Sequence, residues 1–343
     1  MPSGLLRKRA RRLQTGDLRF AAVSAAETAP IRLGTRGSAL ALAQSQRVAD
    51  SIAARTGSPV ELVPITTHGD TSTASLASMG GVGVFVAAVR EALLAGDCDV
   101  VVHSLKDLPT TPHDGLVVAA MPKRADARDA LVSRDGVLLD ALPDGARVGT
   151  GSPRRRAQLR RRRPDLQIVD LRGNVDTRIA RVLGDRDGVE ADLDAVVLAA
   201  AGLERIGRDG VITEHFGIDG WPTAPGQGAL AVETRLGLRG PLQAALQAID
   251  HRSTRLAVDA ERAVLRLLEA GCSAPLGAHA FIDGGMLFLA ARVYSPETGE
   301  QVSSAHALYL DDTTTPALDA AHRVVDELLQ LGAADLAPLG GTP

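Results

Sequence analysis

The 343-residue sequence predicts an α/β fold of two blocks, followed by a smaller α+β region. Short β-branched runs alternate with longer segments of helical periodicity through the first two thirds of the chain. Because parallel strands need crossover helices, this alternation favours mainly parallel sheets. A charge-dense join at 123–129 and a Pro/Gly segment at 222–228 delimit the second block. At about 150 residues per domain, the length fits two or three domains.

The elements follow in order along the chain. In the first block we expect strands at 30–33, 60–66, 99–103 and 116–120, and helices at 38–55 and 84–95. In the second we expect strands at 147–149, 166–170 and 194–198, and helices at 153–163, 176–183 and 201–206. The third region, 250–343, should open with a helix at 256–270 that Gly271 ends, and continue with strands at 278–282, 286–294 and 303–310 and a helix at 315–331.

Composition excludes several classes of protein. Lys+Arg is 38 and Asp+Glu is 41, a net charge of −3, which argues against nucleic acid or an anionic membrane as the main partner. No apolar run approaches the roughly 18 residues that a membrane span needs. The two cysteines rule out a disulfide framework and fit a reducing compartment. The histidines lack metal-ligand spacing, so we expect no metal site.

Two basic regions need separate interpretations. Residues 1–30 carry Lys8 and several arginines without the apolar core of a secretory signal, and we interpret them as a disordered extension, with a transit peptide as the alternative. From Arg154 to Arg178 there are nine arginines against three aspartates. That excess would suit nucleic acid, but the window has no Phe, Tyr or Trp on which bases could stack.

Unusual polar residues gather just after the predicted strands. In open α/β sheets ligands bind beyond the carboxyl ends of strands. Backbone N–H groups at helix starts, with arginines beside them, make anion sites. Ser152 followed by Pro153 is a strong helix-start signal of this kind. Four such segments, at 34–38, 104–107, 150–155 and 172–174, predict a cleft between the first two domains that binds a multiply anionic ligand.

Two single residues carry alternative interpretations. Asp107 fits a helix cap or turn former, but in a cation-rich cleft it would be the one carboxylate able to stabilise positive charge on a substrate. Cys272 fits a buried inert thiol, but its loop position among small residues favours access. Arg154 and Arg155 fit a solvated helix face or, from their place behind the Gly/Ser/Pro turn, ligand binding.

Eight segments together match one known family in order. The chain resembles the porphobilinogen deaminase (hydroxymethylbilane synthase) family over about residues 31–335. Each segment alone is a weak signal, but the set is very specific. The matching segments are GTRGSALALAQ at 34–44, THGD at 67–70, HSLKDLP at 103–109, RVGTGSPRR at 147–155, LRGNVDTR at 171–178, AGLER at 201–205, GQG at 226–228 and GC at 271–272.

The resemblance implies a fold and a reaction. It implies two α/β domains of the periplasmic-binding-protein type (type II) with an active-site cleft between them, at 31–122 with 223–246 and at 128–222, and a third domain at 250–343. It implies that four porphobilinogen molecules are joined head to tail with loss of ammonia, and that water releases 1-hydroxymethylbilane. It also implies a covalent dipyrromethane cofactor, held as a thioether on Cys272, and a cytoplasmic monomer that needs no metal, nucleic acid or membrane. A non-catalytic two-domain anion-binding protein is the alternative.

The resemblance also implies roles for individual residues. Asp107 would hydrogen-bond the pyrrole N–H groups and stabilise positive charge where it develops. Each pyrrole unit carries two carboxylates, which suit arginine forks. In the flexible segment where the family often has lysine, this chain has Val82 and Ser78. The residues that would bind cofactor and substrate are Arg36, Ser38, Gln44, Lys106, Thr150, Ser152, Arg154, Arg155, Arg172, Gly173, Asn174, Arg178, Arg205 and Gln227.

Overall fold

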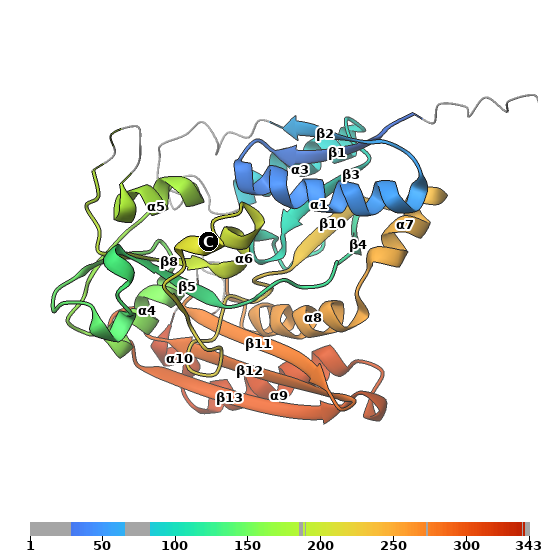
Figure 1. Cartoon of the computed structure of the whole chain (residues 1–343). Coiled ribbons are helices and arrows are strands. Elements are labelled where there is room, and N and C mark those ends of the chain that lie inside the picture. Colours follow the sequence, from blue (N-terminus) through green and yellow to red (C-terminus); the bar gives the residue numbers. More distant parts are fainter. Residues whose placement is uncertain are drawn as a thin grey trace, which may run out of the picture.

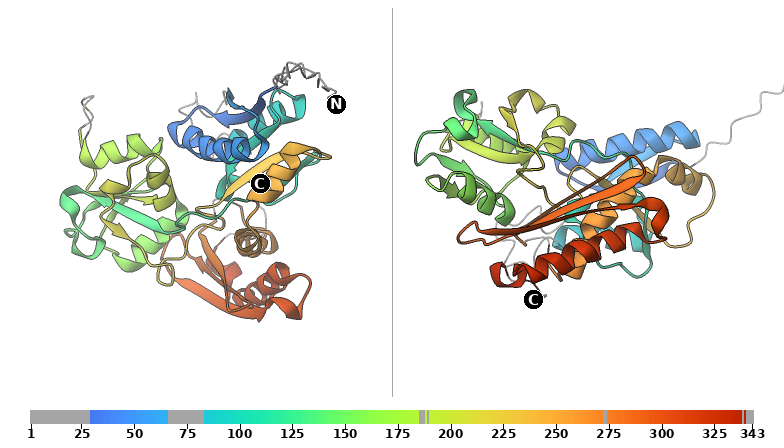
Figure 2. Two further views of the ribbon diagram at one scale, coloured as in Figure 1. Left: turned by 45° about the vertical axis from the view of Figure 1, so that its right-hand side comes forward. Right: turned by 90° about the horizontal axis from the view of Figure 1, so that it is seen from below.

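Three sheets organise the chain in the computed structural model, which describes residues 29–65, 83–184, 188, 190–271, 274–337 and 339. Their strand orders are β2-β1-β3-β10-β4, β7-β6-β8-β5-β9 and β11-β12-β13. The first two sheets lie side by side, and the third lies against both of them (Figures 1 and 2). The predicted fold class, two α/β units and a smaller third unit, is confirmed. No helix in the described part of the chain is long and apolar enough to cross a bilayer.

The first sheet contains strands from two distant parts of the sequence. β1 pairs in parallel with β2 and β3, whereas β10 inserts antiparallel between β3 and β4 after the whole second sheet has been completed. Apolar residues on both faces of the sheet pack under its helices. Its elements are β1 (Ile31–Arg36), α1 (Ala39–Thr56), β2 (Val60–Ile65), α3 (Gly83–Ala95), β3 (Val100–Ser104), β4 (Leu116–Ala120), β10 (Leu230–Arg235) and α7 (Pro241–Ile249).

The second sheet repeats the arrangement of the first. β6 pairs in parallel with β7 and β8, and β5 lies antiparallel between β8 and β9. Here the antiparallel strand comes before the parallel ones in the chain. The elements are β5 (Asp129–Ser133), β6 (Arg147–Gly149), α4 (Pro153–Arg162), β7 (Gln167–Val169), α5 (Val175–Leu183), β8 (Ala195–Ala199), α6 (Ala200–Arg205) and β9 (Glu214–His215).

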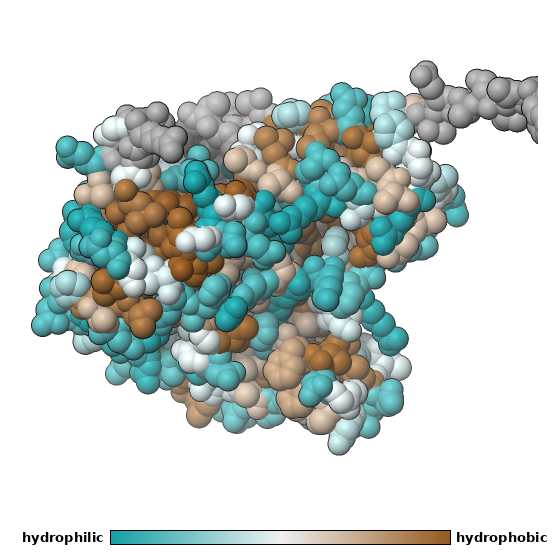
Figure 3. All heavy atoms as spheres, viewed as in Figure 1, coloured by the Kyte–Doolittle hydropathy of each residue, from teal (hydrophilic) through white to brown (hydrophobic). Residues whose placement is uncertain are grey.

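The third sheet is an antiparallel meander that packs one face on helices α8 and α9. Its outer face carries Phe281 stacked on Phe288, with ring centroids 4.8 Å apart, and Phe281 is half exposed. Brown apolar surface is visible on this sheet in Figure 3, although hydrophilic residues cover most of the face in that view. The elements are α8 (Arg252–Leu267), β11 (Leu276–Asp283), β12 (Met286–Tyr294), β13 (Gln301–Tyr309), α9 (Pro316–Gln330) and α10 (Ala333–Leu336).

Most predicted elements are confirmed, with ends shifted by a few residues. The sequence analysis missed β5, β9, β10, α7 and α10. One helix end was also wrong: α8 ends at Leu267, and Glu269, not Gly271, takes up the left-handed backbone with φ 50°. The Ala270 N–H bonds to the Leu265 carbonyl, which closes the helix before the glycine is reached.

Candidate functional site

The turn after β3 presents two of the predicted site residues, Lys106 and Asp107. Leu105 anchors this turn because its side chain is fully buried. Lys106 is partly buried and Asp107 is exposed. Gly226, with φ +76°, lies against Leu105, and a Cβ at that glycine would come within 3.1 Å of the leucine side chain. Only glycine combines this backbone with such a close approach.

Helix α8 of the third unit holds the same turn from the other side. The guanidinium of Arg262 donates to the carbonyls of Leu105 (3.1 Å), Leu108 (2.7 Å) and Pro109 (2.7 Å). Three carbonyls on one fork fix the backbone on both sides of Lys106 and Asp107. The position of these two side chains therefore depends on the third unit as well as on the first sheet.

The start of α4 forms as its sequence predicts. The Ser152 hydroxyl accepts from the Arg155 N–H, Pro153 is the first helical residue, and the Thr150 hydroxyl accepts from the Ser152 N–H at 3.2 Å. Thr150 and Ser152 thus shape the turn. The side chains of Arg154 and Arg155 are both buried. They turn inward, so they do not belong to a solvated helix face.

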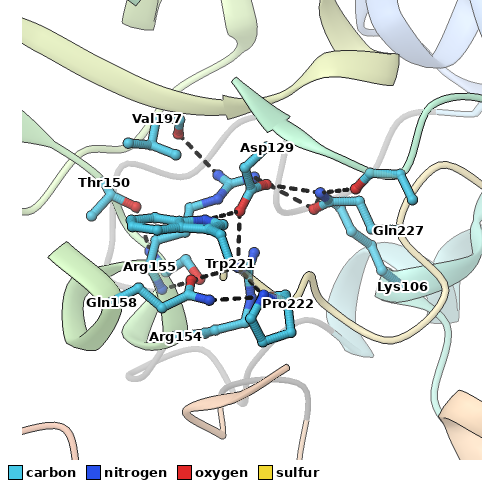
Figure 4. Close-up of polar contacts among 12 residues, drawn as sticks. Lys106, Asp129, Thr150, Arg154, Arg155, Gln158, Val197, Trp221, Pro222 and Gln227 are labelled. Atoms are coloured by element: carbon cyan, nitrogen blue, oxygen red, sulfur yellow. Dashed lines mark hydrogen bonds and ion pairs between the residues drawn. The ribbon is translucent and has the colours of Figure 1, made fainter. Parts of the chain in front are cut away.

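A buried aspartate that the sequence analysis did not select receives both arginines. Asp129, the first residue of β5, is completely buried and accepts from Arg154 Nη1 at 2.8 Å and Arg155 Nη2 at 2.6 Å. Trp221 Nε1 donates to the same carboxylate at 2.9 Å, and Gln227 Nε2 at 2.8 Å (Figure 4). Burial by itself would raise the pKa of Asp129, but the two guanidinium groups hold it well below its usual range.

Gln227 joins this cluster to Lys106 on the first sheet. Its side-chain oxygen accepts from Lys106 Nζ at 3.4 Å and lies 3.5 Å from Arg155 Nη2. Burial lowers the pKa of Lys106 to about 8, and Asp107 partly offsets this by raising it. Arg155, Asp129 and Arg154 also act on Lys106. The junction of the two sheets therefore brings together Lys106, Asp107, Arg154, Arg155 and Gln227.

Helix α5 adds predicted site residues from the second sheet. Asn174 caps the helix through its bond from the Thr177 N–H, and Gly173, with φ +99°, accepts from Arg178 Nε at 2.8 Å. Burial lowers the pKa of Arg178, as does Arg155, whereas Asp107 raises it. The charges of Asp107 and Arg155 therefore both act on Arg178. Arg172 is exposed, with its Nε 3.6 Å from Asp170.

Other predicted site residues lie around the ends of α1 and α6. Arg36 ends β1, and Ser38 caps α1 by accepting from the Ala41 N–H. Gln44 is buried and donates to the Ser104 hydroxyl at 3.0 Å, next to the turn that carries Lys106. Arg205 donates to the Gly228 carbonyl at 2.6 Å, and burial lowers its pKa to about 10.

A second buried carboxylate, Glu261 of α8, was also missed. It accepts from Arg124 at 2.6 and 3.0 Å, from the Gly226 N–H at 2.7 Å and from the Ala280 N–H at 2.8 Å. It therefore ties both chain crossings between the first two sheets to the third sheet. Neither Glu261 nor Asp129 has a local motif, because almost all of its partners are distant in sequence.

Some predictions fall outside the described residues: Cys272, the THGD segment at 67–70, Ser78, Val82 and almost all of the basic extension. Gly271 and Ala274, on either side of the cysteine loop, are described, and the Ala274 N–H bonds to the Gly271 carbonyl. Within the described residues, no three His, Cys, Asp or Glu side chains gather as a metal site would require.

Comparison with known families decides the relationship. The family model described as "Porphobilinogen deaminase, dipyromethane cofactor binding domain" matches residues 31–240, and that of the C-terminal domain matches residues 255–329. The chain belongs to the porphobilinogen deaminase family. The predicted resemblance is confirmed, and with it the enzyme class, a transferase of tetrapyrrole synthesis, and a dipyrromethane-binding module.

Curated members of the family cover nearly the whole chain. The porphobilinogen deaminase of Leifsonia xyli is 58% identical over 91% of this chain and 95% of its own length. That of Thermobifida fusca is 49% identical over 89% and 95%. Among solved structures, immunogenic lipoprotein A from Vibrio vulnificus is 13% identical, with a TM-score of 0.40 over 66% of this chain and 96% of its own.

Proposed function

We propose that this protein condenses four porphobilinogen molecules head to tail, with loss of ammonia, and releases 1-hydroxymethylbilane by hydrolysis. The observation that carries the proposal is the junction of the two sheets, where Lys106 Nζ at 3.4 Å and Arg155 Nη2 at 3.5 Å face the same Gln227 oxygen, with Asp107 next to Lys106 in the turn. Substrate binds between the two sheets, at the carboxyl ends of their parallel strands. Family membership supports the same reaction.

The cations of the junction bind the carboxylates of the growing chain. Every added pyrrole brings an acetate and a propionate, so the ligand becomes more anionic as it lengthens. Arg155 is buried at this junction, and its guanidinium adds positive charge beside the ligand. Lys106, Arg172 and Arg178 supply further positive charge beside the carboxylates of Asp107 and Asp170. This donor set fits dipyrromethane, which carries four carboxylates.

The remaining predicted binding residues act at the margins of the same site. Arg36 and Arg205 would meet ligand carboxylates near α1 and α6. Arg154 is bound to Asp129, so it would favour an anionic ligand through its positive charge rather than by direct contact. Ser38, Gln44, Thr150, Ser152, Gly173 and Asn174 shape the turns and present backbone N–H groups at the helix starts.

Asp107 is the catalytic residue in this proposal. Loss of ammonia from porphobilinogen leaves an electrophile, and its capture puts positive charge on the pyrrole ring nitrogens. The exposed Asp107 carboxylate accepts hydrogen bonds from those N–H groups and stabilises that charge. It can also take and return a proton during the ring's substitution.

Cys272 holds the dipyrromethane cofactor as a thioether. The cofactor supplies the primer to which the first substrate is added. The loop that carries Cys272 follows α8, the helix whose Arg262 holds the Lys106–Asp107 turn. We also propose that residues 31–122 with 223–246, 128–222 and 250–343 are three domains, and that the protein is a cytoplasmic monomer.

The test of function is turnover together with intact mass. The purified protein should consume porphobilinogen, release ammonia and carry a covalent pyrrole adduct that gives the pyrrole colour reaction. Cys272→Ser should abolish the adduct. Cys98→Ala, which changes the buried cysteine of the first sheet, is the matched control and should keep it. Binding of porphobilinogen without release of ammonia would favour the non-catalytic anion-binding protein instead.

Asp107→Ala tests the catalytic role separately. Loss of a group that stabilises developing charge should lower kcat at least 100-fold, by analogy with other electrostatic stabilisers. The adduct should stay attached. Asp114→Ala, at an exposed aspartate beyond the same turn, is the control and should keep the wild-type rate. Retained turnover in Asp107→Ala would remove this residue from the mechanism.

A further inference from the structure

Asp129 lies at the point where the elements of the site converge. The carboxylate is fully buried, and its four donors come from α4 (Arg154 and Arg155), from Trp221 and from Gln227. Both chain crossings between the first two sheets meet here, since Asp129 ends the first and Trp221 and Gln227 belong to the second. Figure 4 shows the carboxylate between the two arginines and the glutamine.

The amide orientation of Gln227 depends on this carboxylate. Gln227 Nε2 donates to Asp129 Oδ1 at 2.8 Å and to the Ala127 carbonyl at 2.7 Å. Both neighbours are pure acceptors, so the NH₂ group must face them and the oxygen must face the other way. That direction is toward Lys106 Nζ and Arg155 Nη2. The reverse orientation would set an NH₂ group against an ammonium and an oxygen against two acceptors.

The same carboxylate also sets the fork of Arg155. Arg155 Nη2 bonds to Asp129 at 2.6 Å and Nη1 to the Val197 carbonyl at 3.0 Å. These two bonds fix the guanidinium plane and therefore the direction of its Nε, which has no hydrogen-bond partner among the residues that the structure describes. Arg154 occupies the other carboxylate oxygen, so the anion is shared between two buried cations.

We infer that Asp129 is a positioning residue for the reaction, which orients Gln227 and Arg155 and through Gln227 holds the ammonium of Lys106. The inference rests on the proposed function, in which Lys106 and Arg155 bind pyrrole carboxylates. Asp129 itself is fully buried behind these groups, so it acts through them rather than by contact with a ligand. Its single negative charge also favours the protonated form of Lys106 in a site crowded with cations.

The isosteric variant Asp129→Asn tests this directly. Its NH₂ group must replace either the oxygen that accepts from Arg154 and Trp221 or the oxygen that accepts from Arg155 and Gln227. In both orientations two donors meet a third, and the charge that holds the network together is lost. The charged groups that act on Lys106 are Asp107, Asp129, Arg154 and Arg155. Removal of Asp129 from this set leaves two cations against one anion. Lys106 should then lose its proton at lower pH.

The readout is the titration of Lys106 itself. The chain has only three lysines, Lys8, Lys106 and Lys123, so reductive methylation with ¹³C gives a simple NMR spectrum in which Lys106→Arg assigns the signal. We expect the midpoint of Lys106 to fall by roughly half a pH unit or more in Asp129→Asn. An unchanged midpoint in the folded variant would overturn the inference.

Kinetics supply the second readout. At pH 7.5 we expect kcat/KM for porphobilinogen to fall about tenfold in Asp129→Asn, chiefly through KM, because carboxylate-binding groups are misplaced. In wild type, kcat/KM should fall as the pH rises and Lys106 loses its proton. In Asp129→Asn this fall should begin at a lower pH than in wild type. Glu233→Gln is the matched control, since Glu233 is equally buried and bonds to Arg90, but within the first sheet. Glu233→Gln should leave the pH dependence of kcat/KM and the midpoint of the Lys106 titration unchanged. A shift of the Lys106 midpoint as large as that in Asp129→Asn would overturn the inference.

A second variant covers the case in which Asp129→Asn does not fold. Gln227→Met keeps Asp129 and both arginine pairs but removes the oxygen that Lys106 contacts. The Lys106 signal and its midpoint should still move, and no movement would count against the inference. The NMR readout needs no turnover. If Lys106 responds but porphobilinogen is not consumed, the proposed function fails while the positioning role stands; the opposite pattern refutes only the positioning role.

Discussion

The first two sheets carry a buried carboxylate on the same strand of their common order, yet the two carboxylates serve different networks. Glu233 lies on β10 and bonds to Arg90 at 2.8 and 2.9 Å, with His103 at 3.3 Å, all within the first sheet and its helix α3. Asp129 lies on β5, and its network passes through α4 and the second crossing to Lys106 on the other sheet. Burial and pairing alone do not distinguish these two carboxylates. They differ in their partners: those of Glu233 stay within the first sheet and α3, whereas those of Asp129 connect the second sheet to Lys106 on the first.

The difference should first appear as a difference in stability. Asp129→Ala leaves two buried guanidinium groups without their anion, and we expect the free energy of unfolding to fall by about 3–5 kcal/mol. Glu233→Ala leaves one buried guanidinium, that of Arg90, without its anion, so the expected loss of unfolding free energy is at or below the lower end of that range. Chemical denaturation measures both, with unchanged m values as the check on two-state behaviour. Equal losses would mean that the second arginine adds nothing.

The pH dependence of stability in acid should show the contribution of the ionised Glu233 carboxylate. Burial alone would raise its pKa, but the neighbouring His103 and the Arg90 guanidinium lower the pKa of Glu233 to about 2, from an ordinary value of 4.5. A carboxyl with a lowered folded-state pKa stabilises the protein above its unfolded value, and this stabilisation disappears as the pH falls from 4.5 toward 2. The shift corresponds to about 3 kcal/mol. Glu233→Gln should therefore unfold with a shallower dependence on pH in this window, as measured by denaturation at several pH values. An unaltered slope would contradict the assignment.

The same comparison explains what the sequence could predict. Local signals predicted well: Ser152 followed by Pro153 marks the start of α4, and alternating runs locate the parallel strands to within a few residues. The turns at Lys106–Asp107 and Arg172–Asn174 follow strands, as expected. These features depend on neighbours within a few positions along the chain.

Asp129 and β10 could not be predicted in this way. Asp129 meets partners 25 to 98 residues away, so its short segment resembles any buried strand. β10 joins the first sheet only after the second is complete, and its pairing depends on tertiary packing. Arg154 stands in a turn that suggests a ligand contact, but its guanidinium is taken up by Asp129, Gln158 and the Pro222 carbonyl.

The smallest expected effect lies at the far end of the Asp129 network. Arg154 donates to Gln158, and Gln158 donates to the buried Tyr294 hydroxyl at 3.1 Å, so the network reaches the third sheet, whereas the described contacts of Glu233 stay in the first. Tyr294→Phe removes that acceptor, but Gln158 keeps the Pro222 carbonyl at 2.9 Å. The free energy of unfolding should therefore fall by only about 1 kcal/mol.

Tyr309→Phe makes the same chemical deletion at a tyrosine that is 56% exposed, and it should change stability little. Denaturation of both variants beside wild type measures the difference. If Tyr294→Phe were as stable as Tyr309→Phe, the Asp129 network would end at Gln158, and the third sheet would be held to α4 by the remaining contacts, such as Gly299 against the Ala157 carbonyl. A loss of unfolding free energy of about 1 kcal/mol in Tyr294→Phe would show that the Tyr294 hydroxyl stabilises the contact between the third sheet and α4, the helix that carries Arg154 and Arg155.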